Sequence, residues 1–462
     1  DTVNEGSELA IIEISSVSGA DSSTSGTTQV AITITEYALR TETAFADNAS
    51  DGVDGSTWAA LSGYNNINLL NASAVHPYTA MNINDVWALT DGTNFLLGQG
   101  QTIHIADMNC NDNLDVFKGG SKNVYNLDDG GAGESTFQND TSSAYHCNAV
   151  ATFALGNDAG GSDNIPWYGV APRADVVLSG INAFEGAYGI DDWADDLDTA
   201  RTSYSAIASN QSWGKCDVTS GNTCVSTYDA SEFDTYYQSE RSNSSLDQLF
   251  GAKLYNLGTT IYSEITTATQ EWITALDNFQ QSGVIVFANG NVSSDSDASF
   301  LAALPYWYNG GTDGLGNSVE DLSEAWISVN FADFTGSDMS GITESEFSLK
   351  GNPCGKAREY CLTVDDWGVN HASWYNESTG ANNYVVGGTG SSYGAPMVSG
   401  GVALVKQAFP NHTPEQIVDR ILASANNSWF TPEGNTTFTS HGNSITHGYH
   451  STWGQGLPDF HA

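Results

Sequence analysis

Hydrophobic and polar positions change their pattern at about residue 75. In residues 1–75, Ser, Thr, Gly and Asp dominate, and Gln29–Thr35 alternates polar and apolar side chains as a half-buried strand does. We expect this segment to be a small β-rich module, the end of an upstream repeat or a propeptide. Residues 76–462 instead combine short apolar runs with longer helical patterns, which indicates a separate, larger domain.

The larger domain has the pattern of an α/β fold. Apolar runs predict strands at 102–106, 174–178 and 284–288, and helical spacing predicts helices at 144–155, 264–281, 391–409 and 413–425. A helix followed by an apolar strand, repeated along the chain, is typical of a parallel sheet with helices on both faces. Two further segments, 215–262 and 301–350, are polar, aromatic and Gly-containing, and we interpret them as surface insertions.

Composition narrows the choice of partners. The 462 residues include 13 Lys and Arg against 55 Asp and Glu, which gives a net charge of −42. Because phosphate binding needs clustered basic side chains, we expect neither nucleic acid nor an anionic membrane surface as a partner. The chain is 40% hydrophobic, which is enough to bury a large core. Salt screens the self-repulsion of such a charge, so we expect a salty or calcium-containing medium.

Cysteine content and hydropathy indicate the compartment. No run of 18 apolar residues is present, so no membrane-spanning helix is expected. The first residues, Asp1–Glu5, lack the basic and apolar regions of a signal peptide, which is therefore absent or already removed. The six cysteines are Cys110, Cys147, Cys216, Cys224, Cys354 and Cys361. Their even number and two close pairs favour three disulfides and a secreted or cell-surface location over six reduced thiols in a cytosolic enzyme.

Four polar residues stand where a parallel sheet places its active site. Asp107 directly follows a predicted strand, and Asn291 follows Gly290 just beyond another. His146 begins a helix of small residues, and Ser392 enters another helix between glycines. Each residue alone has an ordinary explanation as a cap, a turn former or a structural side chain. Together they supply an acid-anchored histidine base, a serine nucleophile and an amide donor for an oxyanion.

The segments around these residues resemble the sequence blocks of the subtilisin-like serine proteases, or subtilases, from about residue 76 to the end. The similar blocks are Ile105–Asn109, His146–Thr152, Tyr168–Asp175, Asn210–Gly214, Phe287–Asn291 and Gly390–Gly400. The resemblance implies a subtilisin-like parallel sheet, a triad of Asp107, His146 and Ser392, and Asn291 in the oxyanion hole. It also implies a substrate cleft lined by Ser212, Trp213, Gly214, Asn289 and Gly290.

A narrower resemblance concerns two segments near the C-terminus. Asn352–Leu362 and Gly454–Asp459 are similar to segments in the passenger domains of autotransporter subtilases of Gram-negative bacteria. Several positions depart from the usual family blocks, including residues 108–109 and 147–149, Gly394 in place of Ala, and Met397 in place of His. Because no triad member is replaced, these departures indicate a divergent subfamily more than an inactive enzyme.

The resemblance also predicts which cysteines pair. Asp107 and His146 must meet in a triad, so we expect Cys110 and Cys147, their neighbours along the chain, to form a disulfide. Local pairing gives Cys216–Cys224 and Cys354–Cys361 as the other two bonds.

The expected function is that of a serine endopeptidase that hydrolyses peptide bonds of extracellular proteins and needs no cofactor for its chemistry. Subtilases often carry structural calcium, and several acidic groups offer oxygen ligands, although their pattern places no site. These groups are Asp112, Asn113 and Asp115, Asp128 and Asp129, the aspartates between 191 and 198, and Asp295 and Asp297.

Two other functions fit parts of the sequence. Gly390–Gly394 also satisfies the Gly-x-Ser-x-Gly pattern of an α/β-hydrolase nucleophile elbow, which would indicate an esterase. The β-patterned N-terminal segment and the polar insertions would instead suit a catalytically weak or inactive surface protein of subtilase fold that assembles through residues 1–75.

Overall fold

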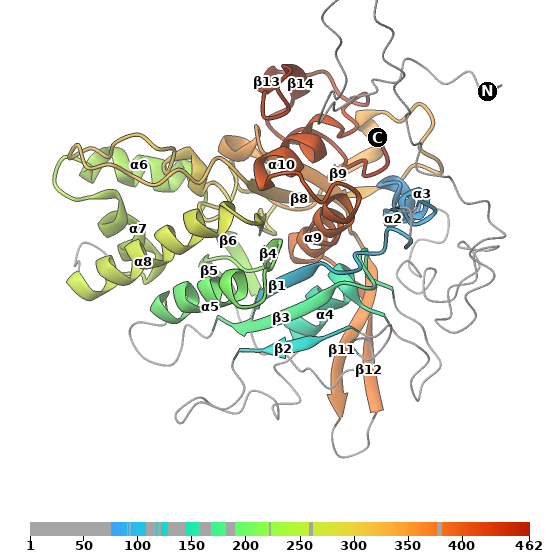
Figure 1. The fold of residues 1–462 in the computed structure, drawn as a ribbon. Coiled ribbons are helices and arrows are strands. Elements are labelled where there is room, and N and C mark those ends of the chain that lie inside the picture. Colours follow the sequence, from blue (N-terminus) through green and yellow to red (C-terminus); the bar gives the residue numbers. More distant parts are fainter. Residues whose placement is uncertain are drawn as a thin grey trace, which may run out of the picture. The chain divides into compact units, whose positions relative to one another are not determined.

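The computed structural model describes residues 75–89, 91, 94–107, 117, 122–127, 145–157, 168–181, 190–220, 223–257, 262–376 and 381–462 (Figure 1). The predicted strand Gln29–Thr35 lies outside these residues, as does nearly all of the proposed N-terminal segment. The division of the chain at residue 75 therefore stays a prediction.

A largely parallel sheet forms the centre of the described fold. In spatial order its strands are β10 (Cys361–Asp365), β8 (Trp326–Phe334), β7 (Val284–Ala288), β4 (Ala208–Gln211), β1 (Thr102–Asp107), β3 (Asp175–Gly180) and β2 (Val124–Asn126). All these neighbours run parallel, with Ile103 of β1 opposite Val176 and Ala208. The short strand β9 (Phe347–Leu349) pairs antiparallel with β8. The predicted α/β class is confirmed.

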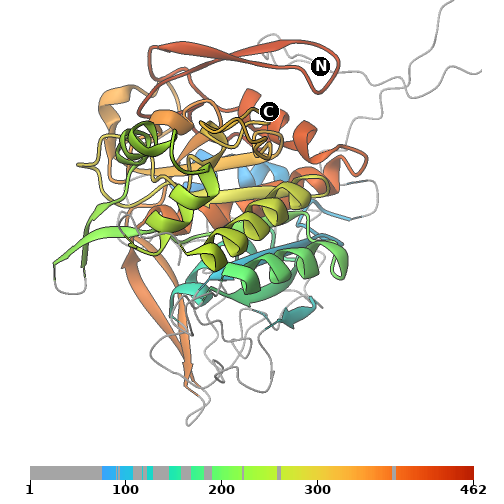
Figure 2. The same cartoon turned by 90° about the vertical axis from the view of Figure 1, so that its left-hand side faces the viewer.

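Helices cover both faces of this sheet (Figures 1 and 2). One face packs against α2 (Pro77–Ala80), α3 (Ile83–Trp87), α4 (Tyr145–Leu155), α9 (Ser391–Ala408) and α10 (Pro414–Ala423). The other packs against α5 (Ile190–Thr202), α6 (Ala230–Glu240), α7 (Leu246–Leu254) and α8 (Ser263–Gln280). Strand β7 shows the division: Val284 and Val286 point into the first core, and Ile285 and Phe287 into the second, as the two-residue period of a strand requires.

Three two-stranded ladders project from this body. They are β5 (Cys216–Ser220) with β6 (Thr223–Thr227), β11 (Val369–Asn376) with β12 (Ala381–Gly388), and β13 (Gly434–Phe438) with β14 (Ile445–Tyr449). Short 3₁₀ turns occur at Leu304–Tyr306, Glu344–Glu346 and Gly355–Ala357. Among the helices that the structure describes, none is long and apolar enough to cross a membrane.

The interpretation of 301–350 as a surface insertion is wrong for Trp326–Phe334, which forms the sheet strand β8. Its polar residues are buried because they have partners: the Ser328 hydroxyl donates to Asn289 Oδ1, and Asn330 Nδ2 donates to the Thr452 carbonyl oxygen. Segment 215–262 is likewise only partly superficial, since the Phe233 and Phe250 side chains are fully buried.

The structure contains the expected Cys354–Cys361 disulfide. Cys147 is also disulfide-bonded, but Cys110 lies outside the described residues, so their pairing stays a prediction. Cys216 and Cys224 lie on the paired strands β5 and β6, and the bond expected between them also remains a prediction.

Candidate active site

Asp107 and His146 form a close pair at one end of the sheet. Asp107 is the last residue of β1 and is fully buried, whereas His146 lies in the first turn of α4. His146 Nδ1 lies 2.7 and 2.9 Å from the two carboxylate oxygens of Asp107. An imidazole held in this way donates its Nδ1 proton to the carboxylate, which leaves Nε2 as a proton acceptor.

The pair sets the proton affinity of the imidazole. Burial lowers the pKa of His146, but the charge of Asp107 and its hydrogen bond raise it more, so the pKa lies above the ordinary value of 6.5. A base whose pKa lies in this region is suited to proton transfer near neutral pH.

Ser392 lies in the first turn of α9, a helix that contacts α4. The ring of the next residue, Tyr393, has its centroid 6.2 Å from that of His146. The Ser392 hydroxyl donates to the Ser212 carbonyl oxygen at 3.1 Å, and the Ser212 hydroxyl donates to the Ser392 carbonyl oxygen at 3.0 Å. Catalytic hydrogen bonds often tighten only in the substrate complex, so the bond to Ser212 does not exclude Ser392 as a nucleophile.

Asn291 is held against the start of α9 by Ser391. Its Oδ1 accepts both the N–H and the hydroxyl of Ser391, each at 2.8 Å, so Nδ2 is the amide atom left to donate elsewhere. Gly390 comes before Ser391 with φ +147°, and a Cβ there would lie 3.2 Å from Asn291 Nδ2. The close approach therefore depends on glycine. Ser391 was missed by the sequence analysis, although it occupies the place of Thr in the Gly-Thr-Ser block.

A pocket with a volume of about 140 Å³ opens next to Ser392. Its walls include Trp213–Lys215 on one side and Gly290–Val292 on the other. The Trp213 ring packs against Trp193, Trp272 and Phe287 at centroid distances of 4.9, 5.8 and 5.4 Å, which keeps that wall rigid. The pocket has room for one amino-acid side chain.

The predicted cleft residues do not all face this pocket. Trp213, Gly214 and Gly290 line it, and Ser212 is buried behind Ser392. The Asn289 side chain does not face the pocket, because it is fully buried. Its Nδ2 donates to the carbonyl oxygens of Asn352 and Pro353, and its Oδ1 accepts the Ser328 hydroxyl.

His104 is a second histidine of β1, and its position is structural. Its Nδ1 lies 2.9 Å from Ser209 Oγ on β4, and its Nε2 lies 2.8 Å from Ser179 Oγ on β3. Burial lowers the pKa of His104 to about 3, so the ring is neutral and ties three neighbouring strands together. No sequence motif marks His104.

The structure does not support the esterase alternative. A nucleophile elbow follows a central strand of a parallel sheet, whereas Ser392 follows β12, which pairs antiparallel with β11 in a separate ladder. Asp107 and His146, which form the close pair, also precede Ser392 in the chain.

The described residues contain no group of three His, Cys, Asp or Glu side chains arranged to hold a metal ion. The acidic groups at 112–115 and 128–129 lie outside the described residues.

Known structures and a protein-family model match this chain over most of its length. The protein is similar in structure to MycP1 from Mycobacterium smegmatis, at 18% identity, with 85% of each chain covered and a TM-score of 0.47. It is also similar to fervidolysin from Fervidobacterium pennivorans, at 18% identity, with 93% of this chain and 48% of that chain covered and a TM-score of 0.47. Among curated protein sequences, none matches the chain. Residues 98–443, most of the chain, match the model of the subtilase family, and the protein therefore belongs to the subtilases.

Proposed function

We propose that the protein is a secreted or cell-surface serine endopeptidase that hydrolyses extracellular proteins through Asp107, His146 and Ser392. The observation that carries the proposal is the 2.7 Å contact between His146 Nδ1 and the buried Asp107 carboxylate, next to a serine in the first turn of a helix. Membership of the subtilase family supports the serine-protease chemistry.

In the proposed mechanism, Ser392 Oγ attacks the scissile carbonyl carbon while His146 Nε2 takes the hydroxyl proton. The imidazolium then gives this proton to the leaving amine, and Asp107 stabilises its charge. The oxyanion accepts hydrogen bonds from Asn291 Nδ2 and from the Ser392 main-chain N–H. Water hydrolyses the acyl-enzyme by the same proton route. The two hydrogen bonds from Ser391 to Asn291 Oδ1 orient the amide donor before substrate arrives. The donor therefore need not reorient during the reaction.

The pocket beside Ser392 would receive the substrate side chain that precedes the scissile bond. Trp213 and Val292 give it apolar walls, and Gly214 lies exposed at its edge. The substrates are polypeptides, and the pocket volume suits a single side chain of intermediate size.

Labelling with a fluorophosphonate tests the assignment of the nucleophile. We expect the probe to modify one serine, Ser392, and Ser392→Ala to abolish both labelling and cleavage of a denatured protein. Ser424→Ala, a partly buried serine at the end of α10, is the matched control and should retain both. Cleavage by purified Ser392→Ala would refute the proposal. Unlabelled wild-type protein that cleaves nothing would instead favour the inactive surface or assembly protein.

Three finer assignments belong to the same proposal. The Cys354–Cys361 disulfide and the bonded Cys147 support an oxidising, extracellular location. The segment Asn352–Leu362 supports a relation to autotransporter passenger domains. Structural calcium and assembly through residues 1–75 rest on the acidic composition and on the N-terminal pattern, and a melting temperature that rises on addition of calcium would support the former.

A further inference from the structure

Asn352 lies behind the loop that carries the proposed oxyanion donor. Its side chain is fully buried, and Oδ1 accepts the main-chain N–H of Val292 at 3.0 Å. Its main-chain N–H donates to the Gly290 carbonyl oxygen at 3.2 Å. One residue therefore bonds the chain on both sides of Asn291.

The other polar atoms of Asn352, Nδ2 and the main-chain carbonyl oxygen, hold its side chain and main chain in place. Nδ2 lies 2.9 Å from Thr227 Oγ1, 3.0 Å from Asp295 Oδ2 and 3.1 Å from the Asp297 carbonyl oxygen. The carbonyl oxygen of Asn352 accepts the buried Nδ2 of Asn289. The side chain cannot rotate without breaking several of these bonds together.

The loop around Asn291 and the segment around Asn352 approach each other so closely that glycine is required at two positions. Gly290 has φ +112°, and a Cβ there would lie 2.4 Å from Asn352 Oδ1. A Cβ at Gly351 would lie 2.6 Å from the Gly290 carbonyl oxygen. Since only glycine fits at these contacts, the two segments are packed main chain against main chain.

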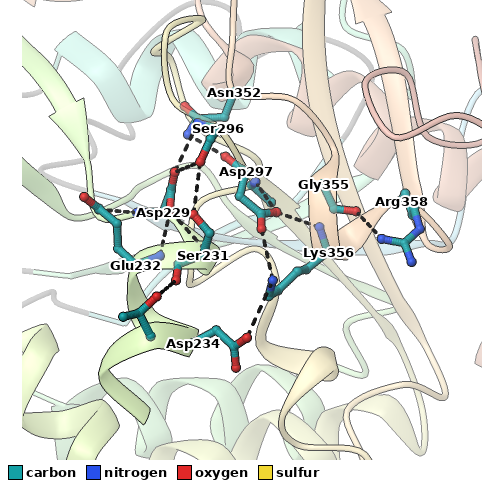
Figure 3. A network of polar contacts seen from close by, with 12 residues as sticks. Asp229, Ser231, Glu232, Asp234, Ser296, Asp297, Asn352, Gly355, Lys356 and Arg358 are labelled. Carbon is teal, nitrogen blue, oxygen red and sulfur yellow. Dashed lines mark hydrogen bonds and ion pairs between the residues drawn. The ribbon is translucent and has the colours of Figure 1, made fainter. Parts of the chain in front are cut away.

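The segment after Asn352 is anchored in turn (Figure 3). Asp297 Oδ1 accepts the Lys356 main-chain N–H at 2.6 Å, and Lys356 Nζ lies 3.4 Å from Asp297 Oδ2 and 3.8 Å from Asp234 Oδ2. The Cys354–Cys361 disulfide closes this segment. Asp229 caps α6 and also accepts the Ser296 N–H at 3.1 Å, so both ends of the 290–298 loop are tied to fixed structure.

Asn291 has few tethers of its own. Its side-chain Oδ1 is held by Ser391, while its main chain makes no hydrogen bond with the described residues. The position of its Nδ2 donor therefore depends on Gly290 and Val292, and Asn352 bonds both of them.

We propose that Asn352 is a positioning residue for the reaction: by bonding Gly290 and Val292 it holds the Asn291 amide where the oxyanion forms. This inference rests on the proposed protease function. It assigns Asn352 no contact with the substrate, so its removal should weaken transition-state binding more than substrate binding.

The test compares four purified proteins: wild type, Asn291→Ala, Asn352→Ala and the double variant. Removal of an oxyanion donor costs about 10²–10³ in kcat, and a displaced donor loses part of this. For Asn352→Ala we expect kcat on a peptide amide to fall about 10–100-fold, with KM changed less than about threefold. The rate constant for fluorophosphonate labelling should fall by a similar factor. The double variant should be little slower than Asn291→Ala, because the positioned group is already gone.

Gln407→Ala provides a control for a merely structural effect. Gln407 Oε1 accepts the N–H groups of Leu97, Gly98 and Gln99, and 15 residues of α9 separate it from Ser392, about 22 Å along the helix. This variant should lower the melting temperature and leave kcat unchanged.

Several results would overturn the inference. One is an unchanged kcat in Asn352→Ala, and another is a rise in its KM alone. A third is a double variant whose loss in kcat is the product of the losses in the two single variants. If Asn352→Ala does not fold, Asn352→Ser is measured against the same expectations, since it keeps a polar atom at the site but loses the reach to Val292. Cleavage by Ser392→Ala would refute the protease function itself, whereas an inactive Ser392→Ala beside a fully active Asn352→Ala would refute only the role of Asn352.

Discussion

Gly394, which replaces the usual Ala after the serine block, lies against the buried carboxyl group of Asp366. A Cβ on Gly394 would stand 3.0 Å from Asp366 Oδ2, 3.2 Å from Val329 Cγ1 and 3.3 Å from Val364 Cβ. Burial, and then the charge of Asp365, raise the pKa of Asp366 well above 3.8, while the nearby N–H groups of Gly394 and Gly390 oppose this. We infer that glycine at 394 makes room for the carboxyl group.

The contacts give an estimate for Gly394→Ala. Alanine is favoured over glycine inside a helix by about 0.5–1 kcal/mol. Overpacking a well-packed core costs about 1–3 kcal/mol, and three atoms lie closer than an ordinary contact. We therefore expect a net loss of about 1–2 kcal/mol in the free energy of unfolding. With Asp366→Ala present, the nearest atom is gone while the contacts with Val329 and Val364 remain, so the same change should cost about 1 kcal/mol less.

Urea unfolding of the four proteins of this cycle measures the coupling. All four should carry Ser392→Ala so that unfolded chains are not digested during the measurement. We expect a coupling energy of at least ~1 kcal/mol, since the two side chains touch. Losses that add within about 0.3–0.5 kcal/mol, the range expected for independent sites, would refute the reasoning, as would a stabilising Gly394→Ala in the unmodified background.

Two further predictions concern pH. The activity should need neutral His146, whose pKa lies above 6.5 because the effect of Asp107 outweighs that of burial. We therefore expect kcat/KM to rise with pH through an inflection above 6.5, and an inflection below 6.5 would contradict this assignment. Asp107→Asn should lower kcat by about 10⁴. Burial raises the pKa of Asp365 to about 8, so the folded state holds this proton more tightly than the unfolded chain, and stability should fall between about pH 4 and 8 by on the order of 5 kcal/mol. Asp365→Asn should reduce that slope in urea unfolding at a series of pH values, although Asp366, whose pKa is also raised, keeps part of it; an unchanged slope would refute the prediction.

The strands that the sequence predicted correctly are those that contain a continuous or nearly continuous apolar run. Val284–Ala288 is apolar throughout because parallel strands face a core on both sides. Such a strand can be predicted from its own residues, without knowing which segments pack against it. Strand β8 escaped the same reasoning because Ser328 and Asn330 interrupt it. Their burial depends on Asn289 and Thr452, and a pattern along one segment does not contain the partners that another segment supplies.

The candidate site also contains residues that a local sequence block predicts and residues whose position depends on distant partners. Asp107, His146, Ser392 and Asn291 were proposed from short blocks, since each block reflects a local turn that presents one side chain. Asn289 belongs to such a block, but its side chain points into the core, because the chain beyond β7 turns around the bonds to Asn352 and Pro353. No spacing in the sequence predicts that turn.

Costly buried contacts at the candidate site favour a maintained site over one in decay. A buried carboxylate such as Asp107 costs folding energy unless it is paired, and a chain without selection for catalysis would be free to replace it with an apolar residue. Here both carboxylate oxygens of Asp107 contact His146 Nδ1, and Ser391 bonds Asn291 Oδ1. Gly394, one of the departures, leaves open the space that the Asp366 carboxyl group occupies. Retention of these energetically costly contacts favours the interpretation that the site is still constrained by its chemistry.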